Sequence, residues 1–99
     1  MITRIVKMTL KPESIEGFNE IFYASQKLIR AFEGCNRLEL MNDINNECIY
    51  FTFSYWNTEE DLNIYRNSYL FKNTWSKVKP MFSVKAEAWS LISNSKQSL

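Results

Sequence analysis

Residues 48–56 read CIYFTFSYW, the densest run of apolar and aromatic side chains in this 99-residue chain. Alternate positions share a face of an extended chain, so the run predicts a β-strand with large side chains on both faces. One face would carry Ile49, Phe51, Phe53 and Tyr55, and the other would carry Cys48, Tyr50, Thr52, Ser54 and Trp56. Such a strand needs cover on both sides of its sheet.

Three other segments alternate in the same way and predict strands over residues 2–10, 35–41 and 83–91. On the first of them, one face would carry Arg4, Val6, Met8 and Leu10. Residues 42–46 read NDINN, which is typical of a tight turn because Asn and Asp tolerate left-handed backbone conformations. The second and third strands are therefore expected to form a hairpin.

Two helical regions separate these strands. Apolar side chains three and four apart predict a long helix over residues 15–32, which Gly34 would end. A second helical region is expected to begin at Thr58, whose side chain can cap it. This region would break near residues 67–68, resume an apolar stripe, and end at Pro80.

The order strand, helix, strand, strand, helix, strand predicts an α+β ferredoxin-like split βαβ fold. Its four-stranded antiparallel sheet would have helices on one face only. The other face is too apolar to be left in water, so a second copy of the chain is expected to cover it in a homodimeric α+β barrel. One domain is expected over residues 1–92, followed by a flexible polar tail over residues 93–99.

The charge pattern excludes several classes of function. The net charge is +1, and the 12 Lys and Arg residues are dispersed, so no basic stripe predicts nucleic-acid binding. The first ten residues, MITRIVKMTL, are too short and polar for a signal peptide, and no apolar run is long enough for a membrane span. A cytoplasmic location is expected.

No cofactor or metal is predicted. The chain has no histidine and no CxxC motif, which argues against a zinc site, and Cys35 and Cys48 are expected to be free thiols. Only two glycines are present, so no glycine-rich phosphate loop for a flavin can be built.

Three segments have a familiar layout, and they are IVKMTLKPES (5–14), FTFSYWNTEEDL (51–62) and YRNSYLFKNTWSKVKPMF (65–82). These segments resemble the antibiotic biosynthesis monooxygenase (ABM) family. The motifs W-x-[ST]-x-x-x-L and S-x-x-F fall on Trp56, Thr58, Leu62, Ser68 and Phe71. The resemblance covers roughly residues 2–91 and implies a dimeric α+β barrel in which two sheets face each other.

The resemblance implies one of several activities. One branch of the family oxidises quinols or polycyclic phenols with molecular oxygen and without metal or flavin. A second branch degrades haem with an asparagine, a tryptophan and a histidine, whose positions here hold Val6, Tyr65 and Trp75, so haem degradation is not expected. Many members also have a histidine in an L-x-x-H-x-x-S motif, where this chain has Tyr65.

Oxygenation of a quinol without a cofactor requires a proton acceptor and a positive or hydrogen-bonding group near the phenolate oxygen. The candidate catalytic residues are Tyr65, Trp56, Arg37 and Glu39, and the candidate substrate-binding residues are Phe51, Phe53 and Trp75. Lys7 and Lys85 are further sources of positive charge, and Glu87 is a further base. Ordinary roles in the core, the dimer interface or surface ion pairs compete for all of these side chains, and the pattern does not tell which sheet face lines a cavity.

The sequence thus favours a cofactor-independent monooxygenase acting on a small aromatic or quinol-like substrate. The alternative is a non-catalytic dimeric barrel that binds a small hydrophobic ligand or acts as an interaction module, which the missing histidine favours. A closed pocket of about 300 Å³ with two or three converging polar groups would support a site. An interior filled by its own side chains would support a structural role.

Overall fold

The computed structural model describes residues 1–94, so residues 95–99 of the predicted tail lie outside the described part of the chain. The elements, in chain order, are β1 (Ile2–Thr9), η1 (Pro12–Ser14), α1 (Ile15–Arg30), β2 (Cys35–Asp43), β3 (Asn46–Trp56), α2 (Glu59–Arg66), α3 (Tyr69–Val78), η2 (Lys79–Met81) and β4 (Glu87–Ile92). None of the helices in residues 1–94 combines the length and apolar character that crossing a membrane requires.

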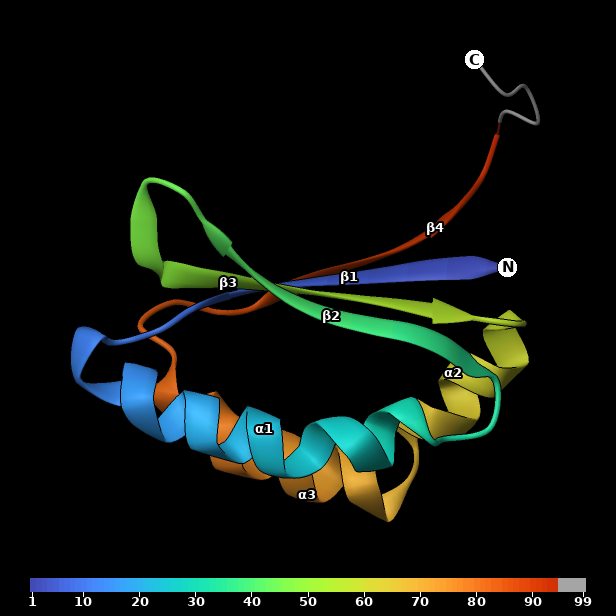
Figure 1. Cartoon of the computed structure of the whole chain (residues 1–99), viewed down its shortest axis with the longest axis horizontal. Helices are drawn as coiled ribbons and strands as arrows, with labels where there is room; N and C mark the ends of the chain where they lie inside the picture. The colour runs from blue at the N-terminus through green and yellow to red at the C-terminus, as the bar shows by residue number, and fades with distance from the viewer. Residues whose placement is uncertain (95–99) are drawn as a thin grey trace.

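Within residues 1–94 the strands form one four-stranded sheet in the order β2-β3-β1-β4, and all neighbouring strands are antiparallel. Both longer helices, α1 and α3, lie side by side on one face of this sheet, and the β2–β3 hairpin projects at one end (Figure 1). This arrangement confirms the predicted α+β ferredoxin-like fold.

The predicted strands and the long helix have somewhat different bounds in the structure, and two of the differences lie at the hairpin turn and at the last strand. The hairpin turn is shorter than residues 42–46, because β2 continues to Asp43 and β3 begins at Asn46. The turn is stabilised by side chains, since Asp43 Oδ1 accepts from the Asn45 amide at 2.7 Å and Asn46 Oδ1 accepts from the Cys48 amide at 2.9 Å. Within residues 1–94 no residue other than glycine has a positive φ, so the expected left-handed Asn or Asp is absent from this turn.

The last strand begins later than residue 83. Its pairing with β1 starts where Glu87 lies opposite Lys7, and the preceding residues lead from η2 back to the sheet. Ser83 is nevertheless tied to β1, because its amide donates to the Thr9 carbonyl at 2.9 Å. The chain thus approaches β1 at Ser83 before it joins the sheet as a strand.

The cap and the break predicted in the second helical region are both present. Thr58 Oγ1 accepts from the Asp61 amide at 3.0 Å and begins α2. Ser68 Oγ donates to the Tyr65 carbonyl at 2.6 Å and accepts from the Phe71 amide at 3.1 Å. Ser68 therefore ends α2 and caps α3, which lets the two helices run in different directions across the sheet.

The core lies between the sheet and the helices. One buried cluster joins both sheet and helices and consists of Met8, Leu10, Phe18, Phe22, Tyr50 and Val78. A second cluster near α2 consists of Cys35, Trp56 and Leu62. Both cysteines are free, and burial is the main cause that raises the pKa of the Cys35 thiol.

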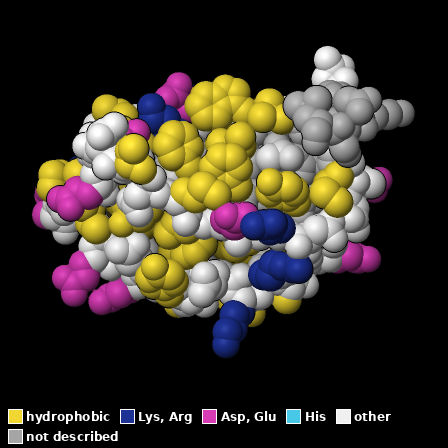
Figure 2. Space-filling view, turned by 45° about the horizontal axis from the view of Figure 1, so that its top comes forward, with side chains coloured by type: hydrophobic (Ala, Val, Ile, Leu, Met, Phe, Trp, Pro, Cys, Tyr) yellow, Lys and Arg dark blue, Asp and Glu magenta, His cyan; other side chains and the backbone are white. Residues whose placement is uncertain are grey.

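The opposite face of the sheet has no helical cover in residues 1–94, and we call it the open face (Figure 1). Ile5 on β1 lies opposite Phe53 on β3 and Trp89 on β4 in one row across this face. Figure 2 shows hydrophobic side chains gathered there. Met41, Trp89 and Leu91 are among the exposed large hydrophobic residues. The predicted apolar second face is therefore confirmed.

Gly34→Ala is expected to lower the free energy of unfolding by about 1–3 kcal/mol, because Gly34 has a φ of +88° that other residues adopt only with strain. A Cβ atom there would also lie 2.5 Å from the Cβ of Asp61. Urea denaturation would measure the loss. The matched control is Gly17→Ala in α1, where the nearest atom is the flexible end of Met81 at 3.3 Å and alanine favours the helix. Equal losses in both variants would contradict this role of Gly34.

Candidate functional site

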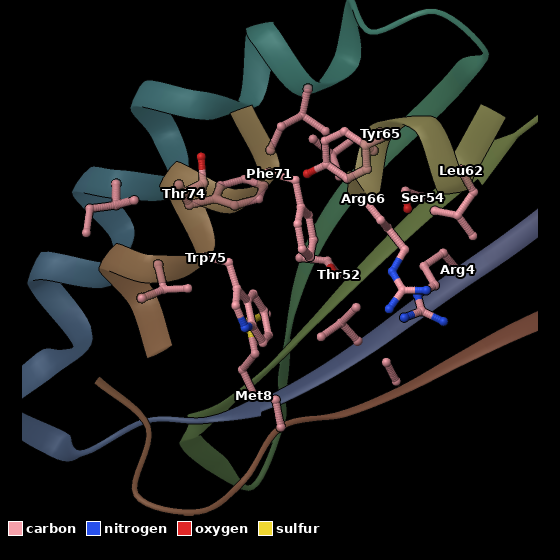
Figure 3. Close-up of a pocket in the computed structure, with 18 of the residues that line it drawn as sticks. Arg4, Met8, Thr52, Ser54, Leu62, Tyr65, Arg66, Phe71, Thr74 and Trp75 are labelled. Carbon is pink, nitrogen blue, oxygen red and sulfur yellow. The ribbon is translucent and has the colours of Figure 1, made fainter. Parts of the chain in front are cut away.

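A cavity of about 300 Å³ lies between the inner face of the sheet and the helices (Figure 3). The strands contribute Arg4, Val6, Met8, Leu38, Thr52, Ser54 and Ala88 to its lining, and Ala86, just before β4, adds to it. The helices contribute Phe18, Ile21, Phe22, Ile29, Leu62, Tyr65, Arg66, Phe71, Thr74, Trp75 and Val78. Most of this surface is apolar, so the cavity suits a hydrophobic molecule with a few polar groups.

Aromatic rings form one wall of the cavity. Phe71 and Trp75 lie one helical turn apart on α3, so their side chains share a face, and their rings stack with centroids 5.8 Å apart and an interplanar angle of 9°. Tyr65, at the end of α2, meets the edge of Phe71 at a centroid distance of 5.3 Å. The break at Ser68 thus places rings from two helices in one continuous wall.

Tyr65 brings a hydroxyl group to this wall, and Figure 3 shows it directed toward Phe71. Burial is the main cause that raises the pKa of Tyr65 well above its ordinary value, and the charge of a Cys35 thiolate would add to the increase. The hydroxyl therefore stays protonated at neutral pH. It has no hydrogen-bond partner within residues 1–94, so it is available to donate to a ligand.

Two arginines lie at the α2 end of the cavity. Arg4 comes from β1 and Arg66 from the last turn of α2, and their guanidinium groups lie near each other (Figure 3). Arg4 Nη1 donates to Ser90 Oγ on β4 at 2.9 Å. Burial first, and the charge of Arg66 second, lower the pKa of Arg4. An arginine nevertheless remains protonated at neutral pH, so this end of the cavity is positively charged.

The seven residues predicted from the sequence divide between the two sides of the sheet. Tyr65 and Trp75 line the cavity. Trp56 lies behind Tyr65 with its ring stacked at 4.9 Å and 24°, and it is 0% exposed, so it supports Tyr65 without lining the cavity. The residues on the open face are Arg37, Glu39, Phe51 and Phe53, and the structure does not bring them together with Tyr65.

The charges on the open face pair with one another. Arg37 Nε forms an ion pair with Glu39 of the same strand. Lys7 Nζ lies 4.0 Å from Glu87 Oε2, also across the open face. These four residues therefore supply no charge to the cavity.

Arg4 and Arg66 were absent from the sequence-based candidates. The signal for Arg4 is its position in the alternating pattern, because a charged residue shares the face of Val6 and Met8, which point toward the helices. Arg66 follows Tyr65 directly, but its approach to β1 depends on how α2 lies over the sheet. No sequence pattern shows how close Arg66 comes to β1.

The fold and the cavity define a small α+β domain with an apolar cavity between its sheet and its helices, and comparison with known proteins gives its family. The sequence model of the family "antibiotic biosynthesis monooxygenase" matches residues 1–76, so the chain belongs to that family and the predicted resemblance is confirmed. A comparison with curated proteins gave no match.

Solved structures share the whole fold. A crystal structure of an antibiotic biosynthesis monooxygenase superposes with a TM-score of 0.90 at 15% identity, covering 96% of this chain and 100% of that one. Rv0793 from Mycobacterium tuberculosis gives a TM-score of 0.88 at 16% identity, covering 98% of each chain. A conserved protein from Methanosarcina mazei Go1 gives 0.86 at 21% identity, covering 92% of this chain and 91% of that one. At these identities the likeness shows the fold alone.

Proposed function

We propose that the protein is a cofactor-independent monooxygenase and that its substrate, a small aromatic or quinol-like molecule, binds in the cavity between sheet and helices. The observation that carries this proposal is an apolar cavity of about 300 Å³ that has an aromatic wall and a free tyrosine hydroxyl. Membership of the ABM family supports a monooxygenase activity in general. The positions that correspond to the haem-degrading residues, Val6, Tyr65 and Trp75, all line this cavity, which supports its choice as the site.

The cavity would act by stabilising the ionised substrate. Tyr65, as a neutral donor, would hydrogen-bond to the phenolate oxygen at the apolar wall of the cavity. Among the described residues, the lining contains no carboxylate and no imidazole. The substrate is therefore expected to lose its proton to water, so acidic phenols and anthrones should react fastest.

The reaction balances without an added reductant. In an anthrone, the electron pair left by loss of a ring C–H proton forms a bond to one atom of molecular oxygen. Protonation of the other oxygen atom gives a hydroperoxide, and loss of water from it gives the quinone. The protein's part is to orient the ring and hold the anion.

Oxygen uptake by metal-stripped protein tests this function against a panel of hydroquinones, naphthoquinols and anthrones. Uptake above the autoxidation blank is expected, and chelators should not reduce it. Tyr65→Phe should lower the protein-dependent rate by about 100-fold, the typical cost of removing one donor to a developing oxyanion. Tyr69→Phe is the matched control, because Tyr69 is 80% exposed and lies outside the cavity. The proposal would be overturned by no uptake across the panel, or by equal losses in both variants.

One observation favours the alternative function. Tyr65 replaces the family's histidine, and no other base lines the cavity within the described residues. A non-catalytic barrel that binds a small hydrophobic ligand, or serves as an interaction module, would have this composition. Binding of a naphthoquinol without any oxygen uptake would support it.

We propose that the open face is covered by a second copy of the chain in a homodimer, with the proposed domain over residues 1–92 as the protomer. Exposed apolar residues on this face, such as Met41, Trp89 and Leu91, support that interface. The proposal includes a cytoplasmic location, which agrees with the two free cysteines.

A further inference from the structure

We propose that Arg4 and Arg66 form an anion-binding subsite at the α2 end of the cavity, and that the ligand is an aromatic molecule carrying a carboxylate. The inference deepens the proposed function, because it rests on the same cavity and names the class of molecule that the cavity takes. The carboxylate would lie between the two guanidinium groups, and the rings would lie along the wall of Phe71 and Trp75.

The two guanidinium groups are brought together by different elements. Arg4 is on the inner face of β1, in register with Ser90 of β4, whose hydroxyl accepts from it at 2.9 Å. That bond uses one of the five N–H donors of Arg4 and leaves the others for a ligand. Arg66 reaches toward Arg4 from α2, and Figure 3 shows both groups at the same end of the cavity.

The charge of this pair is not balanced by the protein. Within residues 1–94, neither Arg4 nor Arg66 forms an ion pair with a carboxylate. The nearness of Arg66 contributes to the lowered pKa of Arg4, which reflects repulsion between the two cations. A bound anion would relieve this repulsion and accept from both groups. A cleft residue whose pKa is shifted both by burial and by a neighbouring like charge often belongs to a functional site.

The shape of the subsite favours a carboxylate. A guanidinium is a planar fork of donors that matches the two oxygens of a carboxylate, and such paired bonds are the strong ones. Beyond the arginines the lining turns apolar, at Val6, Met8 and Trp75, so a second charged group would find no partner there. The preferred ligand is therefore flat and apolar with its charge at one end.

The test is calorimetric titration under nitrogen with 2-naphthoate and its neutral isostere 2-naphthamide. We expect the wild-type protein to bind naphthoate at least about tenfold more tightly, which corresponds to about 1.4 kcal/mol. Arg66→Gln should remove this preference, because it weakens naphthoate binding much more than naphthamide binding, and Arg66→Lys should retain part of it. Arg4→Gln should act like Arg66→Gln. Lys72→Gln is the matched control, because it removes one positive charge from an exposed site on α3 outside the cavity.

Equal affinities of the wild-type protein for the two probes would overturn the subsite, and so would no binding of either at millimolar concentration. A preference for naphthoate that survives Arg66→Gln would also overturn the subsite. Because the Arg66 side chain is exposed, this variant should fold even if Arg4→Gln does not. Binding under nitrogen is independent of oxygen chemistry. Charge-dependent binding without oxygen uptake would overturn the monooxygenase and leave the subsite. Oxygen uptake without a preference for naphthoate would overturn the subsite and leave the monooxygenase.

Discussion

Trp56→Ala is expected to lower the free energy of unfolding by about 3–5 kcal/mol, the usual cost of truncating a buried tryptophan. Trp56 is completely buried in one cluster with Cys35 and Leu62, and it stacks on Tyr65. Its indole Nε1 also donates to Ser54 Oγ at 2.9 Å, and that bond is lost. Domains of this size are stable by only about 5–15 kcal/mol, so the melting temperature should fall by roughly 15 °C or more.

Trp56→Phe separates the packing of this side chain from its hydrogen bond. The smaller ring can still stack on Tyr65 but cannot donate to Ser54, so a loss well below that of Trp56→Ala is expected. Thermal and urea unfolding followed by circular dichroism would give both values. A loss under about 1 kcal/mol in Trp56→Ala would show that the contacts of Trp56 contribute little to stability.

Phe53→Glu is expected to convert the proposed dimer into monomers. Phe53 lies at the middle of the open face, opposite Ile5 on β1 and Glu39 on β2. A carboxylate there would be buried without a partner in the dimer, and it would also lie across from Glu39, a like charge. Sedimentation velocity at micromolar concentration should find twice the chain mass of 11.8 kDa for the wild-type protein and a single chain mass for the variant.

Ile44→Glu is the control for this experiment. Ile44 is 96% exposed at the tip of the β2–β3 hairpin, so the same new charge should leave the dimer intact. Circular dichroism would check that Phe53→Glu remains folded. Trp89→Glu on β4 is a second substitution on the open face that should also disrupt the dimer. A folded wild-type monomer of 11.8 kDa would contradict the dimer.

The fold was predictable because each of its parts has a local signal. The alternation in residues 48–56, the cap at Thr58 and the break near Ser68 each depend on neighbouring residues, and the order of the elements then leaves few topologies. The hairpin turn was predicted in place but not in conformation. Side-chain bonds from Asp43 and Asn46 stabilise it, and left-handed residues are not used.

The site was predictable only in part, because alternation shows which residues share a face but not which face meets the helices. Both faces of residues 48–56 carry apolar side chains, so hydrophobicity did not show which face lines the cavity. The choice was between the face of Phe51 and Phe53 and the face of Thr52 and Ser54. The structure places the second pair in the cavity. Arg4 and Arg66 meet only through the tertiary arrangement of α2 over β1.

The chain's three tryptophans occupy three separate environments. Trp56 is sealed in the core, Trp75 is on the cavity wall, and Trp89 is 43% exposed on the open face. Indole fluorescence shifts to longer wavelength as the ring meets water. Variants that keep only one of the three would therefore report unfolding through Trp56, ligand entry through Trp75 and subunit association through Trp89, each without an added dye.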